Sequence, residues 1–112
     1  MDKYITSLTD GLFQWGKVKG DFNCSWCDLL ESLKGAPKEV DYFYCGKCKN
    51  LTSLKGVPEV VERVFSCRLT SITSLEGCPK VVGGNFVCND CETVFTEEDV
   101  RKVSKVKGDI IV

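Results

Sequence analysis

The chain of 112 residues contains no histidine. Without histidine, the Ser-His and Cys-His pairs that activate nucleophiles cannot form, and zinc sites with a histidine ligand are excluded as well. A basic excess is also missing, because 15 Lys and Arg stand against 16 Asp and Glu and the net charge is −1. Proteins that hold phosphate backbones need a basic face, so we expect no nucleic-acid partner.

Long apolar runs are absent too. No stretch of about 18 apolar residues occurs, so we expect no membrane span. The start of the chain, MDKYITS, has no basic segment followed by an apolar one, so no secretory signal is visible. These features predict a single small cytoplasmic domain whose thiols stay reduced.

What the sequence does have is a repeat. Pro37, Pro58 and Pro79 are 21 residues apart, and a glycine stands two places before each of them. A Phe-x-Cys triplet recurs four times, once before the first block and once after each, with steps of 21, 22 and 21 residues: Phe22/Cys24, Phe43/Cys45, Phe65/Cys67 and Phe86/Cys88. Residues two apart on a strand point to one face, so stacking these units forms a parallel sheet over a shared core of Phe and Cys.

The period lies within the roughly 20–29-residue range of leucine-rich repeats. Unit two matches the pattern L-x-x-L-x-L-x-x-N/C-x-L with Val40, Phe43, Cys45 and Cys48, and Leu51 comes one residue late. Three other residues take the N/C position of their units: Cys27, Thr70 and Cys91. The closer resemblance, over residues 18–95, is to the short leucine-rich repeats of tailed-bacteriophage proteins, on residues 51–58 (LTSLKGVP) and 81–88 (VVGGNFVC).

This resemblance implies an α/β repeat solenoid of the leucine-rich-repeat type. We expect about five short parallel strands in one curved sheet, with turns or 3₁₀ segments on the convex side. Residues 1–17 would form an N-terminal cap, residues 18–95 the repeats, and residues 96–112 a C-terminal cap. In that cap Thr96 begins a short helix over about 97–105 that turns Val100, Val103 and Val106 inward.

The eight cysteines allow three interpretations. Cys24, Cys27, Cys45 and Cys48 fit a four-cysteine zinc pattern, but stacked repeats create this spacing automatically. Reduced cysteine is a small apolar residue that is often buried, so we expect a buried column of thiols and no metal or other cofactor. A zinc-binding structural module and a thiol oxidoreductase remain the alternatives.

The residues that alternate with Phe and Cys should form the outer face of the sheet. This face is rich in tyrosine and carries an arginine, which is the composition of an interface centre. The predicted partner-binding residues are Asn23, Trp26, Tyr42, Tyr44, Val64, Arg68, Val87 and Asn89. Trp26 has a second interpretation, in which its ring covers the core.

We therefore expect a non-catalytic protein-binding module. The phage resemblance implies an accessory protein that binds and inhibits or redirects a host protein in the cytoplasm of an infected bacterium. The apolar end of the chain, residues 110–112 (Ile110, Ile111 and Val112), is a second candidate surface, because an uncovered edge strand invites pairing and hence a homodimer. The terminal helix or the chain end could shield that edge instead.

Overall fold

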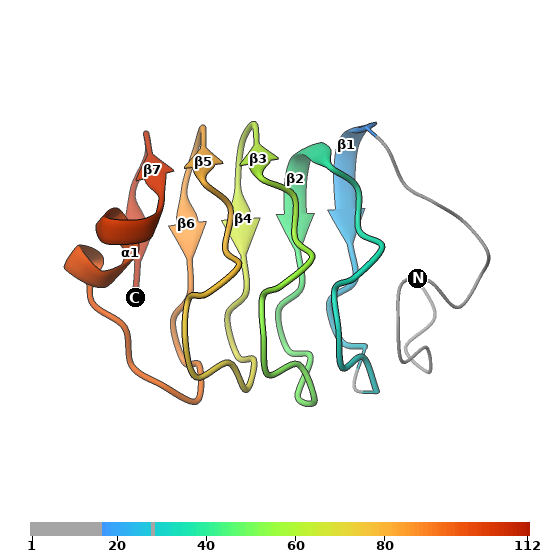
Figure 1. Cartoon of the computed structure of the whole chain (residues 1–112), viewed down its shortest axis with the longest axis vertical. Coiled ribbons are helices and arrows are strands. Elements are labelled where there is room, and N and C mark those ends of the chain that lie inside the picture. The colour runs from blue at the N-terminus through green and yellow to red at the C-terminus, as the bar shows by residue number, and fades with distance from the viewer. Residues whose placement is uncertain (1–16, 28) are drawn as a thin grey trace.

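The computed structural model describes residues 17–27 and 29–112. The chain winds into a β-solenoid whose turns, called coils here, lie side by side from one end to the other (Figure 1). Eight strands form one sheet: β1 (Lys17–Asn23), β2 (Glu39–Tyr44), β3 (Val60–Val61), β4 (Phe65–Ser66), β5 (Val81–Val82), β6 (Phe86–Val87), β7 (Lys105–Val106) and β8 (Ile110–Ile111). Every pair of neighbouring strands is parallel, which confirms the predicted fold class.

The number of strands exceeds the five expected because the later coils each contribute two. Coil one contains β1, coil two β2, coil three β3 and β4, coil four β5 and β6, and β7 and β8 follow at the C-terminal end. Val40 and Phe43, three residues apart on the continuous β2, pair with Val61 and Phe65, which are four residues apart. The extra residue shifts the register against β2, as a β-bulge does. The same four-residue spacing, from Val18 to Phe22, occurs in β1, which shows a register shift against β2 but stays one strand. The next two coils keep this spacing and are divided into β5/β6 and β7/β8.

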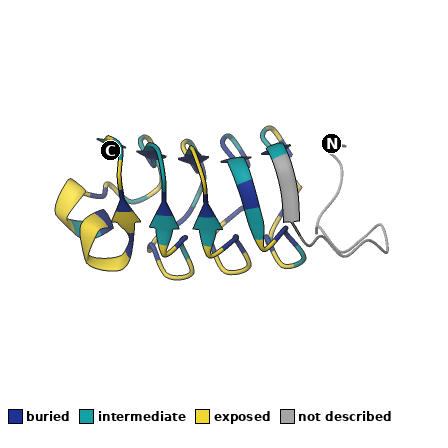
Figure 2. Cartoon of the chain, turned by 90° about the horizontal axis from the view of Figure 1, so that it is seen from above, coloured by how far each residue is buried: buried dark blue, intermediate teal, exposed yellow. Residues whose placement is uncertain are grey.

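The phenylalanines form the predicted internal column. The ring centroids of Phe22 and Phe43 are 5.4 Å apart, those of Phe43 and Phe65 5.8 Å, and those of Phe65 and Phe86 5.1 Å. All four side chains are buried. Figure 2 colours the backbone by burial and shows that buried stretches recur from coil to coil, while exposed residues gather at bends and in the C-terminal helix.

Tight turns close the return segments. In residues 54–57 the Val57 N–H donates to the Leu54 carbonyl over 3.2 Å, and Gly56 has a φ of +99°. A positive φ at the third position is what a type II turn requires. A Cβ at Gly56 would also lie 2.6 Å from the Leu33 carbonyl carbon of the preceding coil, so the glycine permits close stacking as well.

Helix α1 (Glu97–Val103) covers the C-terminal end of the solenoid. Thr96 begins it with a capping box, because its hydroxyl accepts from the Asp99 N–H over 3.1 Å while the Asp99 carboxylate accepts from the Thr96 N–H over 3.0 Å. Val100 and Val106 are buried as expected, but Val103 is 48% exposed, so its inward placement was wrong. The helix also ends at Val103, two residues before the expected end near residue 105.

Two further expectations concern the chain ends and the membrane. The predicted N-terminal cap, residues 1–17, lies outside the described residues except for Lys17, so it stays a prediction. In the part of the chain that the structure describes, no helix is long and apolar enough to cross a membrane.

Candidate functional site

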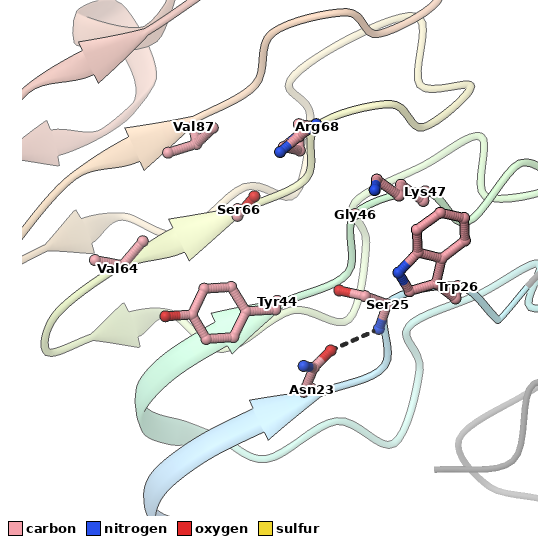
Figure 3. A pocket seen from close by; sticks show the side chains of 10 residues that line it. All are labelled: Asn23, Ser25, Trp26, Tyr44, Gly46, Lys47, Val64, Ser66, Arg68 and Val87. Carbon is pink, nitrogen blue, oxygen red and sulfur yellow. Dashed lines mark hydrogen bonds between the residues drawn. The ribbon is translucent and has the colours of Figure 1, made fainter.

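A groove of about 450 Å³ lies on the outer face of the sheet. The strand register places Asn23 beside Tyr44, Tyr44 beside Ser66, and Ser66 beside Val87. Tyr44 therefore stands in the middle of the groove, with the first coil on one side and the third and fourth on the other (Figure 3). Ten residues line it: Asn23, Ser25, Trp26, Tyr44, Gly46, Lys47, Val64, Ser66, Arg68 and Val87.

The turns that follow the strands shape one end of this groove. In each of these four coils a residue with a left-handed backbone stands two places after the cysteine that follows the strand. These residues are Trp26, Lys47, Leu69 and Asp90, with φ values of 67°, 62°, 57° and 59°. This conformation bends the chain so that the residue after it, the N/C position of the repeat, points back inside.

The inward residue then satisfies a backbone carbonyl of the preceding or the same coil. The Cys48 thiol donates to the Cys24 carbonyl over 3.0 Å, and the Cys91 thiol donates to the Cys67 carbonyl over 3.2 Å. Thr70 takes the same position in coil three, and its hydroxyl donates to the Cys67 carbonyl over 2.8 Å. Cysteine and threonine are interchangeable here because each supplies one short side-chain donor.

Trp26 forms a wall of the groove. Its side chain is 59% exposed, so the interpretation in which it covers the core was wrong. The Nζ of Lys47 lies 3.9 Å from the centre of the indole ring, a cation–π contact. A left-handed backbone destabilises the fold by about 1–2 kcal/mol at a bulky residue. An exposed ring buries little apolar area, so its burial offsets little of this cost. Folding alone therefore does not account for tryptophan at this position.

Gly46 forms the floor. It is buried and has an ordinary φ, so its backbone does not require glycine. A Cβ at Gly46 would lie 3.1 Å from the Arg68 carbonyl oxygen and 3.2 Å from the Arg68 Cγ. The missing side chain thus leaves room for the aliphatic stem of Arg68, from the third coil, to lie against Gly46 of the second.

Tyr44 presents a neutral phenol. Partial burial raises its pKa above the ordinary value, and the carboxylate of Asp21 on the neighbouring strand raises it further. The ring also stacks on Tyr42, with a centroid separation of 6.0 Å. Tyr44 therefore offers both apolar area and a hydroxyl that can donate at neutral pH.

The charge in the groove has one sign. Lys47 and Arg68 are its charged residues, both at the turn end, and the ten lining residues include no acid. Within the described residues neither cation forms a salt bridge. The groove thus combines apolar and aromatic walls with a positive end that none of its ten lining residues compensates.

Six of the eight predicted partner-binding residues meet in this groove: Asn23, Trp26, Tyr44, Val64, Arg68 and Val87. Tyr42 supports Tyr44 from outside the lining. Asn89 also lies outside it and donates to the Asp90 carboxylate over 3.0 Å.

Four lining residues were not among the predicted partner-binding residues: Ser25, Gly46, Lys47 and Ser66. The alternation with Phe and Cys already places Ser25, Gly46 and Ser66 on the outer face of the sheet. Lys47 takes the same turn position as Trp26 one coil later, and this equivalence was the signal that could have found it.

All eight cysteines lie in the described part of the chain and are free thiols. Six are buried, as the thiol column requires, and Cys78 and Cys91 are half-buried. No group of three or more His, Cys, Asp or Glu side chains among the described residues is arranged to hold a metal ion. The zinc alternative with Cys24, Cys27, Cys45 and Cys48 therefore gains no support from the geometry.

The second candidate surface is the edge strand β8. Among the described strands it pairs with β6 and ends the sheet. Ile111 and Val112 are about half exposed there. Residues 110–112 thus lie at an edge of the sheet, as the sequence predicted. The pairing of this edge with a second chain stays a prediction.

No protein-family model, no curated protein and no solved structure matches this chain. The argument for function therefore starts from the groove and its chemistry.

Proposed function

We propose that the chain is a non-catalytic protein-binding module and that the groove around Trp26, Tyr44 and Arg68 is its docking site. Trp26 carries this proposal. An exposed tryptophan in the left-handed region has the wrong residue type for local stability, where glycine or asparagine would serve better. Binding a partner buries this ring, which is exposed in the free protein.

The composition of the groove supports the same function. Tryptophan, tyrosine and arginine are the residues that contribute most at protein interfaces, above all near the centre of the buried patch. Here Tyr44 lies at the centre, with Trp26 and Arg68 contributed by the coils on either side. Neutral polar residues complete the lining and can donate or accept at its rim.

Charge complementarity defines the partner. Lys47 and Arg68 call for a carboxylate, because no acid in the lining compensates them. Val64 and Val87, together with the Tyr44 ring, offer contact to an apolar side chain. The occupant that fits is a protein segment in which an aspartate or glutamate stands close to an apolar or aromatic residue.

The repeat resemblance adds a biological setting to this proposal. Residues 51–58 and 81–88 resemble the short repeats of tailed-bacteriophage proteins, so we place the partner among the proteins of an infected bacterium. Binding in the groove would inhibit or redirect that host protein.

Selection from a random peptide library on the immobilised full chain tests the groove and its charge preference together. We expect the enriched peptides to combine acidic and apolar residues. Arg68→Glu should abolish their binding, whereas Arg63→Glu, an identical charge change at an exposed residue outside the groove, should leave it intact. Enrichment of basic peptides, equal effects of the two variants, or no enrichment at all would overturn the proposal.

A further inference from the structure

Another cavity lies at the C-terminal end of the solenoid, beside helix α1 and strand β7 (Figure 1). Its volume is about 330 Å³. Three of the residues that line it are cations, one from the last turn of α1 and two from β7 and the residue after it: Arg101, Lys105 and Lys107. The other lining residues carry no charge: Val81, Ser104 and Val106.

The strand brings two of these cations onto one face. The N–H groups of Lys105 and Lys107 both donate to coil four, over 2.8 Å and 3.0 Å. Both side chains are exposed, whereas Val106 between them is buried. Residues two apart on a strand point to the same side, with Cα atoms about 6.6 Å apart. The two ammonium groups therefore share the outer face of the sheet, where like charges repel each other.

The neighbouring coil supplies no acid to offset this repulsion. In the sheet Lys105 stands beside Val81, an apolar residue. Elsewhere stacked coils do place an acid beside a cation, as where the Nζ of Lys80 lies 3.6 Å from the Glu59 carboxylate. Among the described residues neither Lys105 nor Lys107 forms a salt bridge.

Arg101 is held at the edge of β7 and keeps donors to spare. One of its Nη atoms lies 3.4 Å from the Val106 carbonyl oxygen, and the other lies 3.2 Å from a Glu97 carboxylate oxygen. A guanidinium group has five N–H donors, so an occupant of the cavity can use those that remain. Glu97 offsets the charge of Arg101 from outside the lining, and Asp109, two residues after Lys107, also lies outside it. Two lysines thus stay without an acid.

We propose that this cavity binds the phosphate group of a small phosphomonoester. Such a group carries a charge of about −1.5 to −2 near neutral pH, which matches the two lysines, whereas a carboxylate would leave one of them unmatched. Its three terminal oxygens can accept from both ammonium groups and from the guanidinium group. The side chain of Val81 adjoins the same cavity and can contact the organic part of the ligand.

A nucleic-acid backbone fits this cavity less well. Each phosphodiester carries one charge, and a bound strand needs cations that continue along its path. Here the sheet neighbour of Lys105 is apolar, and the chain as a whole has a net charge of −1. The site is therefore suited to a single phosphate group, and it is separate from the groove around Trp26.

Titration of the ¹⁵N-labelled full chain with methyl phosphate tests the site. Two-dimensional ¹H–¹⁵N spectra are recorded near neutral pH, with sodium chloride keeping the ionic strength constant. We expect saturable shifts at the amides of residues 101–107 and 81–83. Dimethyl phosphate, a singly charged diester, and a short oligothymidylate should each bind more weakly, by about tenfold or more, because each of their phosphates carries only one charge.

Two double variants separate the site from general charge effects. Replacing both lysines, Lys105→Gln with Lys107→Gln, should weaken methyl phosphate binding by about tenfold or more. Lys34→Gln with Lys55→Gln removes the same charge at exposed residues of the return segments and should leave binding unchanged. The wild-type shifts locate the site even if a variant fails to fold. Unsaturable shifts spread over the whole chain, equal losses in the two double variants, or tighter binding of the diester or the oligonucleotide would overturn the inference.

Discussion

The Nζ of Lys47 lies 3.9 Å from the centre of the Trp26 ring, and both residues stand at the same left-handed turn position of consecutive coils. The contact is thus a product of stacking, because neighbouring turns carry equivalent residues side by side. It holds the indole ring in place at the groove while leaving much of its surface exposed. The free protein keeps an apolar surface ready for a partner.

Replacing Trp26 separates folding from binding. We expect Trp26→Gly to leave the free energy of unfolding unchanged or to raise it by up to about 1 kcal/mol, because glycine tolerates the left-handed backbone while only an exposed cation–π contact is lost. Affinity for the selected peptides should fall by about 2 kcal/mol. Urea unfolding and peptide titration measure the two effects. A stability loss well beyond 1 kcal/mol would make Trp26 a structural residue and contradict the account.

Filling the floor of the groove should also weaken binding. Gly46→Ala places a methyl group against the Arg68 stem, so Arg68 must shift while the backbone of residue 46 keeps its ordinary conformation. We expect a stability cost of no more than about 1 kcal/mol and a larger loss of peptide affinity, about 1–2 kcal/mol. Calorimetric titration with a selected peptide checks this. Undiminished affinity would show that Arg68 does not act from its present position.

The phenylalanine column should dominate stability. Phe43 is fully buried between Phe22 and Phe65, so Phe43→Ala should reduce the free energy of unfolding by about 3–5 kcal/mol. Tyr42→Ala, at the adjacent residue on the opposite face, should cost about 1 kcal/mol or less. Thermal unfolding followed by circular dichroism compares the two variants. Similar losses would mean that the two faces of β2 contribute alike, contrary to the observed burial.

Thr70, at the N/C position of coil three, stabilises its turn by donating a hydrogen bond from its side chain. Thr70→Val keeps the shape but leaves the Cys67 carbonyl without the hydroxyl that lies 2.8 Å from it, so we expect a loss of about 1–2 kcal/mol. Thr70→Cys restores the residue type of the sister coils and should cost less. Urea unfolding of both variants measures the difference. A valine variant as stable as the wild type would show that this hydrogen bond does not stabilise the fold.

The stacking of Phe22, Phe43, Phe65 and Phe86 could be predicted because their spacing equals the length of one coil. The equivalence of Thr70 and Cys91 could be predicted for the same reason, since both occupy the N/C position of their units. Position along the repeat thus determined which side of the sheet each residue faces.

Other features depend on contacts between neighbouring coils, which the local sequence pattern does not predict. Trp26 and Lys47 are residue types that seldom adopt a left-handed backbone, so neither their turn nor their contact was foreseeable. The register shift between β2 and the next coil follows from one extra residue between Val61 and Phe65, and it becomes visible only when the two coils are paired. Likewise, the Cys91 thiol donates to the backbone carbonyl of Cys67 in the preceding coil, a contact that the Cys88-x-x-Cys91 motif does not predict.

Site-specific photo-crosslinking in expressing bacterial cells tests the docking site most directly. A benzophenone amino acid replaces Asn23, an exposed residue on the rim of the groove, and in a second sample it replaces Thr73, an exposed residue on a return segment. The account predicts a discrete protein adduct from position 23 that disappears with Arg68→Glu, and none from position 73. Equal adducts from both positions, or an adduct from position 73 alone, would contradict it.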